Sequence, residues 1–223
     1  MMKRNDFHVS RLSARLLLLL ALLLASPGGL QAKATDADTL RVLAIGNSFS
    51  QDAVEQYLHE LGKSEGYIMI IGNMYIGGCS LERHVKNIRN NTPAYAYRKV
   101  DKNGERVEIR EMTIEKALAD EPWDYVSLQQ ASPVSGIYET YKASLPELVD
   151  YVKPRVSKKT VLMMHQTWAY AGNSTHSGFK NYNSSQMKMY TDIVNAVKES
   201  AGLVGINKII PSLPPIQHAR TTL

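Results

Sequence analysis

The sequence has few cysteines and lacks several common binding motifs, and each absence excludes or disfavours a class of protein. Its 223 residues include one cysteine, Cys79, so an internal disulfide is excluded. No Cys/His cluster has the spacing of metal ligands. No stripe of Lys and Arg interleaved with aromatic residues is present, which argues against a nucleic-acid partner. The chain also lacks a Gly-rich or Ser/Thr-rich phosphate cradle after its first strand, which disfavours a nucleotide-binding protein.

Long apolar runs are rare too, and the clearest one lies near the start of the chain. Its ten residues, 16–25, follow a basic segment and precede small residues that end at Ala32. This pattern is typical of a secretory signal peptide cleaved after Ala32, since the run is short for a membrane span. An uncleaved anchor is the alternative. We expect a periplasmic or extracellular protein, without membrane contact after cleavage, and the lack of disulfides is typical of a bacterial envelope protein.

Most of the net positive charge belongs to this leader. The whole chain has 26 basic and 21 acidic residues, of which residues 1–32 hold four and one, so residues 33–223 carry 22 and 20. The remaining excess of two basic residues is a weak argument for a polyanionic partner.

Residues 33–223 form one predicted domain in which strands and helices alternate. Apolar runs that begin at Leu40, Tyr67, Trp123, Thr160 and Lys208 predict buried strands, and amphipathic segments between them predict helices. This alternation favours an α/β fold, a three-layer α/β/α sandwich with about five parallel strands. Segments 95–101 and 106–110 predict an inserted β-hairpin, whose charged faces indicate a surface flap. Residues 141–156 predict a single helix despite two prolines.

The first strand ends at a turn that presents a hydroxyl group. The run that starts at Leu40 breaks at Gly46, and Ser48 follows just before a helical pattern. In an open α/β sheet, ligands bind beyond the carboxyl ends of the strands, where the next helix directs its free N–H groups. Ser48 is therefore a candidate nucleophile. The alternative is that Ser48 or Ser50 only caps the helix.

The later strands place further polar or flexible residues at the same edge. Gly77 and Gly78 follow the second strand and allow a ligand to approach the backbone closely. Gln129 and Gln130 follow the third, where side-chain amides can donate hydrogen bonds to an oxyanion, although solvated loop glutamines are the commoner case. His165 ends the fourth.

These blocks, in this order, resemble the SGNH (GDSL-type) hydrolases. More narrowly, the sequence resembles the DUF4886 type of Bacteroidetes in three segments, which are residues 46–50, 123–130 and 165–170. The resemblance implies a flavodoxin-like sheet and a serine esterase that needs neither metal nor organic cofactor. Its expected substrate is a small-molecule or carbohydrate ester, deacylated by removal of a group such as acetate.

The resemblance also implies a role for each site residue. Ser48 is the expected nucleophile, and Gly78 and Gln130 are the expected oxyanion donors, although most SGNH enzymes carry asparagine in place of Gln130. His165 is a candidate base or pocket residue. The expected substrate contacts are Asn47, Gly77, Gln129 and Trp168.

One SGNH block is missing from the sequence. These enzymes take their base from a C-terminal Asp-x-x-His block, and residues 201–223 contain no such motif. Without a base, a serine hydroxyl is a poor nucleophile at neutral pH. Either the chain is truncated or this member has lost the triad, and a non-catalytic carbohydrate- or ligand-binding relative is the alternative function. His218 is a further possible substitute, although a surface position is expected for it.

Overall fold

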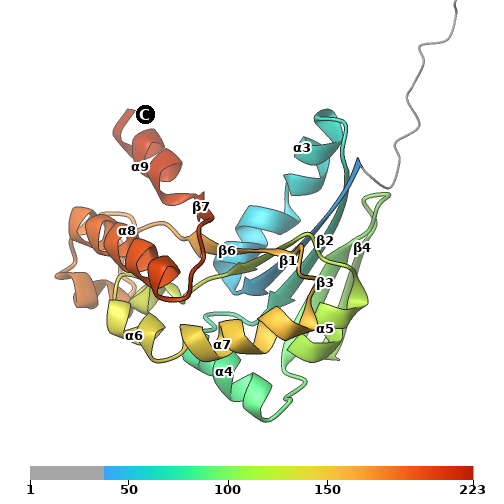
Figure 1. Ribbon diagram of the computed structural model, residues 1–223. Coiled ribbons are helices and arrows are strands. Elements are labelled where there is room, and N and C mark those ends of the chain that lie inside the picture. The colour runs from blue at the N-terminus through green and yellow to red at the C-terminus, as the bar shows by residue number, and fades with distance from the viewer. Residues whose placement is uncertain (1–37, 223) are drawn as a thin grey trace, which may run out of the picture. The chain divides into compact units, whose positions relative to one another are not determined.

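The structure is a computed structural model that describes residues 38–222. The predicted signal peptide, residues 1–32, lies outside the described residues. Seven strands form one sheet in the order β4-β3-β2-β1-β5-β6-β7 (Figure 1). They are β1 (Thr39–Gly46), β2 (Ile68–Tyr75), β3 (Tyr95–Val100), β4 (Arg106–Met112), β5 (Tyr125–Leu128), β6 (Val161–Gln166) and β7 (Ile209–Pro211).

Five of these strands, β2, β1, β5, β6 and β7, run parallel, as the sequence predicts. The sheet has seven strands in place of about five because the predicted hairpin adds β3 and β4, with β3 antiparallel to β2. The prediction of a surface flap is wrong for β3. Its alternation hides Tyr95 and Tyr97 in the core, while β4 is an exposed edge strand. Charged side chains along β4 disfavour pairing with another chain.

The helices cover the two faces of the sheet unequally. On one face, residues of α4, α5, α7 and α8 share a large core with alternate residues of β1 and β5. On the other face, Val54 of η2 and Leu58 of α3 pack with Ala44, Met69 and Ile71 in a small core. The helices are α2 (Ser48–Ser50), η2 (Gln51–Glu55), α3 (Leu58–Ser64), α4 (Leu81–Arg89), α5 (Ile114–Asp120), η3 (Ser132–Val134), α6 (Tyr138–Lys142), α7 (Leu145–Val152), η4 (Lys153–Arg155), η5 (Ser177–Tyr182), α8 (Gln186–Leu203) and α9 (Leu213–Thr222).

The single helix predicted for residues 141–156 is replaced by short helices. Helix α6 ends at Lys142, and α7 begins at Leu145 with Pro146 in its first turn. A proline is tolerated there because the N–H of that position has no partner within the helix, whereas the same ring clashes with a preceding helical turn. Pro146 thus separates two helices.

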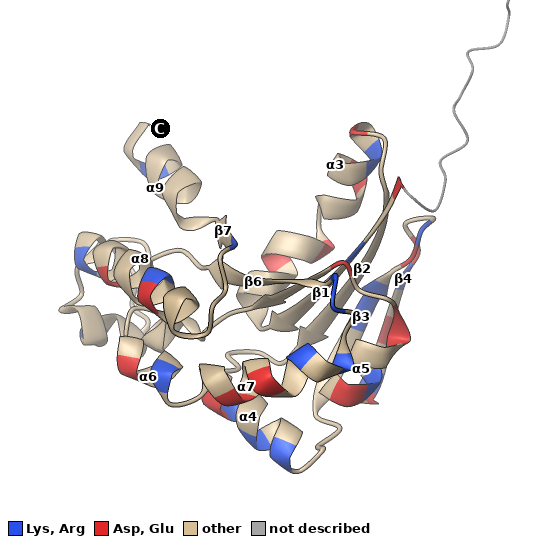
Figure 2. Ribbon diagram, viewed as in Figure 1, with Lys and Arg blue, Asp and Glu red and all other residues tan. Residues whose placement is uncertain are grey.

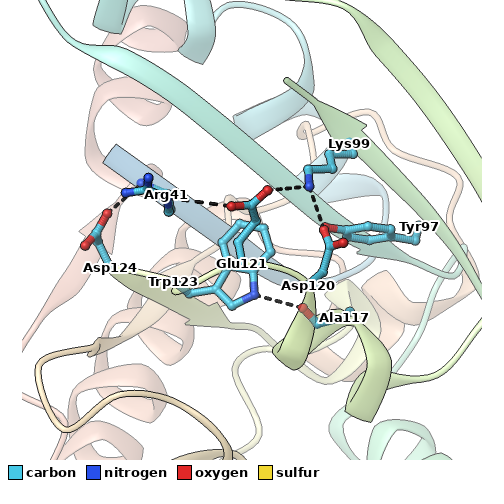
Figure 3. A network of polar contacts seen from close by, with 8 residues as sticks. All are labelled: Arg41, Tyr97, Lys99, Ala117, Asp120, Glu121, Trp123 and Asp124. Atoms are coloured by element: carbon cyan, nitrogen blue, oxygen red, sulfur yellow. Dashed lines mark hydrogen bonds and ion pairs between the residues drawn. The ribbon is translucent and has the colours of Figure 1, made fainter. Parts of the chain in front are cut away.

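A polar network fastens the hairpin to the corner between α5 and β5 (Figure 3). The Tyr97 hydroxyl donates to Asp120 Oδ2 at 2.6 Å, and Lys99 Nζ lies 2.8 Å from the same carboxylate and 2.5 Å from Glu121 Oε1. The Trp123 indole N–H donates to the carbonyl of Ala117 at 2.8 Å. Burial and the neighbouring Asp120 raise the pKa of Tyr97, so its hydroxyl stays protonated. The network explains how a strand with polar residues joins the sheet.

Lys/Arg and Asp/Glu residues are interspersed on the helices that cover the larger core (Figure 2). Both signs occur on α4 and on α5, and Arg89 of α4 pairs with Glu147 of α7. The arrangement is that of a solvated surface. Within residues 38–222, none of the helices has the length and apolar character needed to cross a bilayer.

Candidate active site

Ser48 is the first residue of α2, immediately after β1, and its side chain is exposed. Within the described chain, Ser48 Oγ has no hydrogen-bond partner. The helix is capped by Asn47, whose side-chain oxygen accepts from the N–H of Phe49 at 3.1 Å. The possibility that Ser48 or Ser50 caps this helix is therefore wrong, and the Ser48 hydroxyl is left facing solvent at the carboxyl end of the parallel sheet.

Asn47 connects the turn after β1 to the loops after two neighbouring strands. Its Nδ2 donates to the carbonyl of Cys79 at 2.9 Å, and its Oδ1 accepts from Gln129 Nε2 at 2.6 Å. The Asn47 side chain is buried, and both of its polar atoms have protein partners. In this geometry Asn47 holds the residues around Ser48 in place, and its predicted contact with substrate stays a prediction.

Gly77 and Gly78 form an exposed turn beside Asn47. The N–H of Cys79 donates to the carbonyl of Ile76 at 3.1 Å, which closes the turn, and Gly78 has a φ of +62°. A side chain at Gly78 would meet no atom within 4 Å, so backbone conformation is what requires glycine there. The N–H groups of both glycines lack an acceptor in the part of the chain that the structure describes.

Gln129 is buried and bridges Asn47 to His165. Its Oε1 lies 2.7 Å from His165 Nδ1, and the other ring nitrogen, Nε2, lies 3.0 Å from Ser212 Oγ. The close packing requires Gly46, because a Cβ there would lie 2.7 Å from the Gln129 side chain. Burial lowers the pKa of His165 to about 4, so the ring is neutral at pH 7.

Gln130 is buried as well, and its side-chain oxygen accepts a hydrogen bond from the first residue of α4. Its Oε1 accepts from the N–H groups of Leu81 and Ala131, both at 2.9 Å, and its Nε2 donates to Thr140 Oγ1 at 3.1 Å. Ser80 caps the same helix through the N–H of Arg83 at 3.2 Å. One amide hydrogen of Gln130 is committed to Thr140, and its predicted role as an oxyanion donor stays a prediction.

Trp168 lies against the helix that carries Ser48. Its ring centroid is 4.3 Å from that of Phe49, with the planes tilted by 55°. Trp168 also lines a hollow of about 590 Å³, with residues from η2, from β7 and from the start of α9. His218 is exposed on α9, as the sequence predicts for a surface residue.

A second set of side chains supports the same turn and was missed in the sequence. Ser50 Oγ donates to Asn73 Oδ1 at 2.8 Å, and Asn73 Nδ2 donates to Glu55 Oε1 at 2.5 Å. Arg98 lies 3.5 Å from Glu55 and 3.9 Å from the centre of the Tyr75 ring. The asparagine that ends the apolar run at residues 67–73 was the available signal, since a buried amide requires partners.

The single cysteine lies near the site but in an unreactive setting. Burial raises the pKa of Cys79 to about 12 and lowers the pKa of the neighbouring His84 to about 3. The His84 Nδ1 lies 2.8 Å from the Tyr95 hydroxyl. Both groups are uncharged at neutral pH, and a neutral buried thiol is a poor nucleophile.

Among residues 38–222, no cluster of three or more His, Cys, Asp or Glu side chains could hold a metal ion.

Comparison with known proteins identifies relatives of this architecture. The model of the family DUF4886, a domain of unknown function, matches residues 41–223. The crystal structure of a DUF4886 protein from Bacteroides uniformis is 76% identical, with a TM-score of 0.82 over 82% of this chain and 71% of that one. A search of curated proteins finds no match.

More distant structures share the fold. A candidate SGNH hydrolase from Slackia heliotrinireducens is 19% identical, with a TM-score of 0.53 over 81% of this chain and 83% of its own. A catalytic mutant of Axe2, an acetylxylan esterase from Geobacillus stearothermophilus, is 14% identical, with a TM-score of 0.51 over 82% and 81%. The exposed serine after β1 and the ordered loops after β2 and β5 thus lie on a known framework: the chain belongs to the DUF4886 family and has the fold of the SGNH hydrolases.

Proposed function

We propose that this protein is an exported serine ester hydrolase of the SGNH type, with Ser48 as its nucleophile. The observation that carries the proposal is the position of Ser48, which is exposed at the carboxyl end of β1 with a hydroxyl that makes no protein hydrogen bond within residues 38–222. The Ser48 oxygen attacks the ester carbonyl carbon, and the carbonyl oxygen becomes an oxyanion. The original C–O bond then breaks, and the leaving oxygen takes up the proton that Ser48 has lost and departs as an alcohol. Water then releases the acyl group from Ser48.

Backbone N–H groups are the natural donors to the oxyanion. Those of Gly77 and Gly78 lack protein acceptors in the described chain, and the Asn47–Cys79 hydrogen bond holds their turn beside the residue that precedes Ser48. Donors of this kind stabilise charge as it develops, and each is worth on the order of 10²–10³ in rate. Gln130, which ties the same loops together, is the third proposed donor through its remaining amide hydrogen.

The base is the incomplete part of this site. Both ring nitrogens of His165 already have partners, Gln129 and Ser212, so His165 would have to release Ser212 before it could accept the Ser48 proton. This observation favours a second candidate function, in which the protein binds a ligand at the same strand ends but does not catalyse a reaction.

A carbohydrate ester is the proposed substrate. The acetylxylan esterase that shares the fold supports this class, although at 14% identity the likeness concerns the fold alone. Trp168 borders the hollow beside α2, where an aromatic ring can stack on a sugar. An export signal at residues 1–32 would place the enzyme where such polymers are found, and the mass of the mature protein from a secreting host tests cleavage after Ala32.

Hydrolysis of p-nitrophenyl acetate and of acetylated xylo-oligosaccharides tests the proposal. We expect Ser48→Ala to lower kcat/KM by at least about 100-fold for both substrates, in line with loss of a nucleophile. Ser64→Ala removes an exposed hydroxyl on α3 and is the matched control, expected to keep full activity. A folded protein without activity that depends on Ser48 would overturn the esterase and leave the binding function, which calorimetry with xylo-oligosaccharides would then detect.

A further inference from the structure

Ser212 and His165 form a hydrogen-bonded pair that the proposed function does not use. Ser212 Oγ lies 3.0 Å from His165 Nε2, and His165 Nδ1 lies 2.7 Å from Gln129 Oε1. Ser212 is partly exposed, whereas His165 and Gln129 are buried. A hydroxyl, an imidazole and a side-chain oxygen in this sequence have the arrangement of a nucleophile, its base and the group that orients the base.

The direction of each hydrogen bond follows from the partners of Asn47. The Nδ2 of Asn47 donates to the Cys79 carbonyl, so Oδ1 faces Gln129 and must accept from its Nε2. Gln129 Oε1 therefore accepts, and His165 Nδ1 carries the proton. His165 Nε2 is then left with its lone pair, and the Ser212 hydroxyl donates to it. This is the tautomer that a general base requires.

The usual reason for a serine at this position does not apply. Ser212 immediately precedes α9, where a serine ordinarily accepts from the second or third N–H of the helix. Those positions are Pro214 and Pro215, which have no N–H. The hydroxyl is free to donate to His165, and Ser212 lines a hollow.

That hollow is the one of about 590 Å³ beside Trp168. Ser212 lines it together with Ile210, Pro215 and Ile216, and Asp52 is the one charged residue of the lining within residues 38–222. Its apolar walls suit the acyl chain or aromatic group of an uncharged ester.

We propose that Ser212 is a second nucleophile, with His165 as its general base and Gln129 as the positioning residue, and that it acts on small uncharged esters. Ser212 Oγ forms a bond to the acyl carbon while its proton moves to His165 Nε2. The proton then passes to the leaving oxygen as the original C–O bond breaks, which yields an alcohol and acyl-Ser212. A water molecule that gives a proton to His165 attacks the acyl carbon, and the acid leaves as Ser212 regains its proton.

The reaction at Ser212 is slow compared with that of a triad that contains a carboxylate. Gln129 is neutral and adds no charge to stabilise an imidazolium, and burial lowers the pKa of His165 to about 4. The two hydrogen-bond partners of the ring, Gln129 and Ser212, are neutral, and Asp52 is the charged residue in the described lining of the hollow beside Ser212. The rate is expected to be constant above about pH 5 and to fall below it as Nε2 becomes protonated.

Labelling of the full chain with a fluorophosphonate, followed by tryptic peptide mapping, tests the proposal. Residues 209–220 form one tryptic peptide in which Ser212 is the only hydroxyl side chain, and Ser48 lies in a different peptide, 42–63. We expect label on 209–220 in the unaltered protein and in Ser48→Ala, and none in Ser212→Ala. Ser132→Ala, which removes a hydroxyl bonded to Tyr170, is the control that retains the label.

His165→Asn separates catalysis from structure. Asparagine can still donate to Gln129 from the place of Nδ1, but it has no atom in the place of Nε2, so labelling at 209–220 should slow by at least about 100-fold. Circular dichroism verifies folding of each variant. The absence of label on 209–220 in the folded protein, or a labelling rate unchanged by His165→Asn, would overturn the proposal. Because Ser48 is mapped separately, either serine can fail without the other.

Discussion

Gln129 contributes to the stability of the site through two buried hydrogen bonds. It is 1% exposed and links Asn47 to His165. We expect Gln129→Leu to lower the free energy of unfolding by about 2 kcal/mol, because the His165 Nδ1–H loses its acceptor in a buried place. Urea unfolding measures this. Gln56→Leu, at an exposed position, should change stability by less than about 0.5 kcal/mol, and equal effects at both positions would contradict the role given to Gln129.

Two buried histidines make stability depend on pH. Burial lowers the pKa of His165 to about 4 and that of His84 to about 3, whereas an unfolded histidine has a pKa of about 6.5. Above pH 6.5 both rings are neutral in both states, and their contribution is complete. As the pH falls from 6.5 to 4, the unfolded chain binds protons that the folded protein does not, so stability drops by up to about 1.4 kcal/mol per pH unit for each ring.

Urea unfolding at pH 7, 6 and 5 measures this loss. The exposed His218 offers the control, since His218→Asn should leave the pH dependence in place. Stability that stays constant or rises between pH 7 and pH 5 would show that the two rings are not buried as neutral groups.

At the scale of single residues, the sequence predicts what lies at the strand ends but not what each residue does there. Gly46 and Ser48 mark the turn because backbone breaks are local signals. The sequence does not predict that Gln129 orients His165, since the two residues lie 36 positions apart and belong to no common motif. Ser212 could have been noticed from the two prolines that follow it, which exclude the ordinary cap.

At the scale of elements, periodicity predicts the parallel strands and the hairpin, yet it does not predict how the hairpin is used. Alternation shows that one side of residues 95–101 is more apolar than the other, and tyrosines with polar tips are compatible with a flap or a strand. The structure resolves this through Asp120, which accepts from the Tyr97 hydroxyl and lets the ring be buried. A contact of this kind between distant segments is not encoded in local pattern.

Gly72 in the middle of β2 leaves room for two aromatic rings to pack closely against the strand. A Cβ at Gly72 would lie 2.8 Å from Trp123 and 2.9 Å from Tyr97, both of which are buried rings. We expect Gly72→Ala to cost about 2 kcal/mol, since rigid aromatic side chains must shift. Gly202→Ala is the matched control, because no atom lies within 4 Å of its Cβ and alanine favours the helix α8. Thermal unfolding compares the two, and a neutral Gly72→Ala would mean that the rings can move.

At the scale of the molecule, the sheet divides the described chain into two cores of unequal size. The larger core joins α4, α5, α7 and α8 to the sheet, whereas the smaller one holds η2 and α3 (Figure 1). Helix α3 has seven residues and leaves Leu61 60% exposed, with Tyr57 just before it at 68%. Few buried apolar contacts mean a low free energy of local opening.

Hydrogen exchange should therefore be faster in α3 than in α4, although the two helices differ by only two residues in length. Mass spectrometry of exchanged peptides measures the difference. Met69→Ala removes a side chain from the smaller core, and we expect faster exchange in α3 with α4 unchanged. Val85→Ala does the same to the larger core and should speed exchange in α4 but not in α3. Equal protection of both helices, or a response of both to either variant, would mean that the two cores open together. The turn that presents Ser48 would then be as rigid as the sheet.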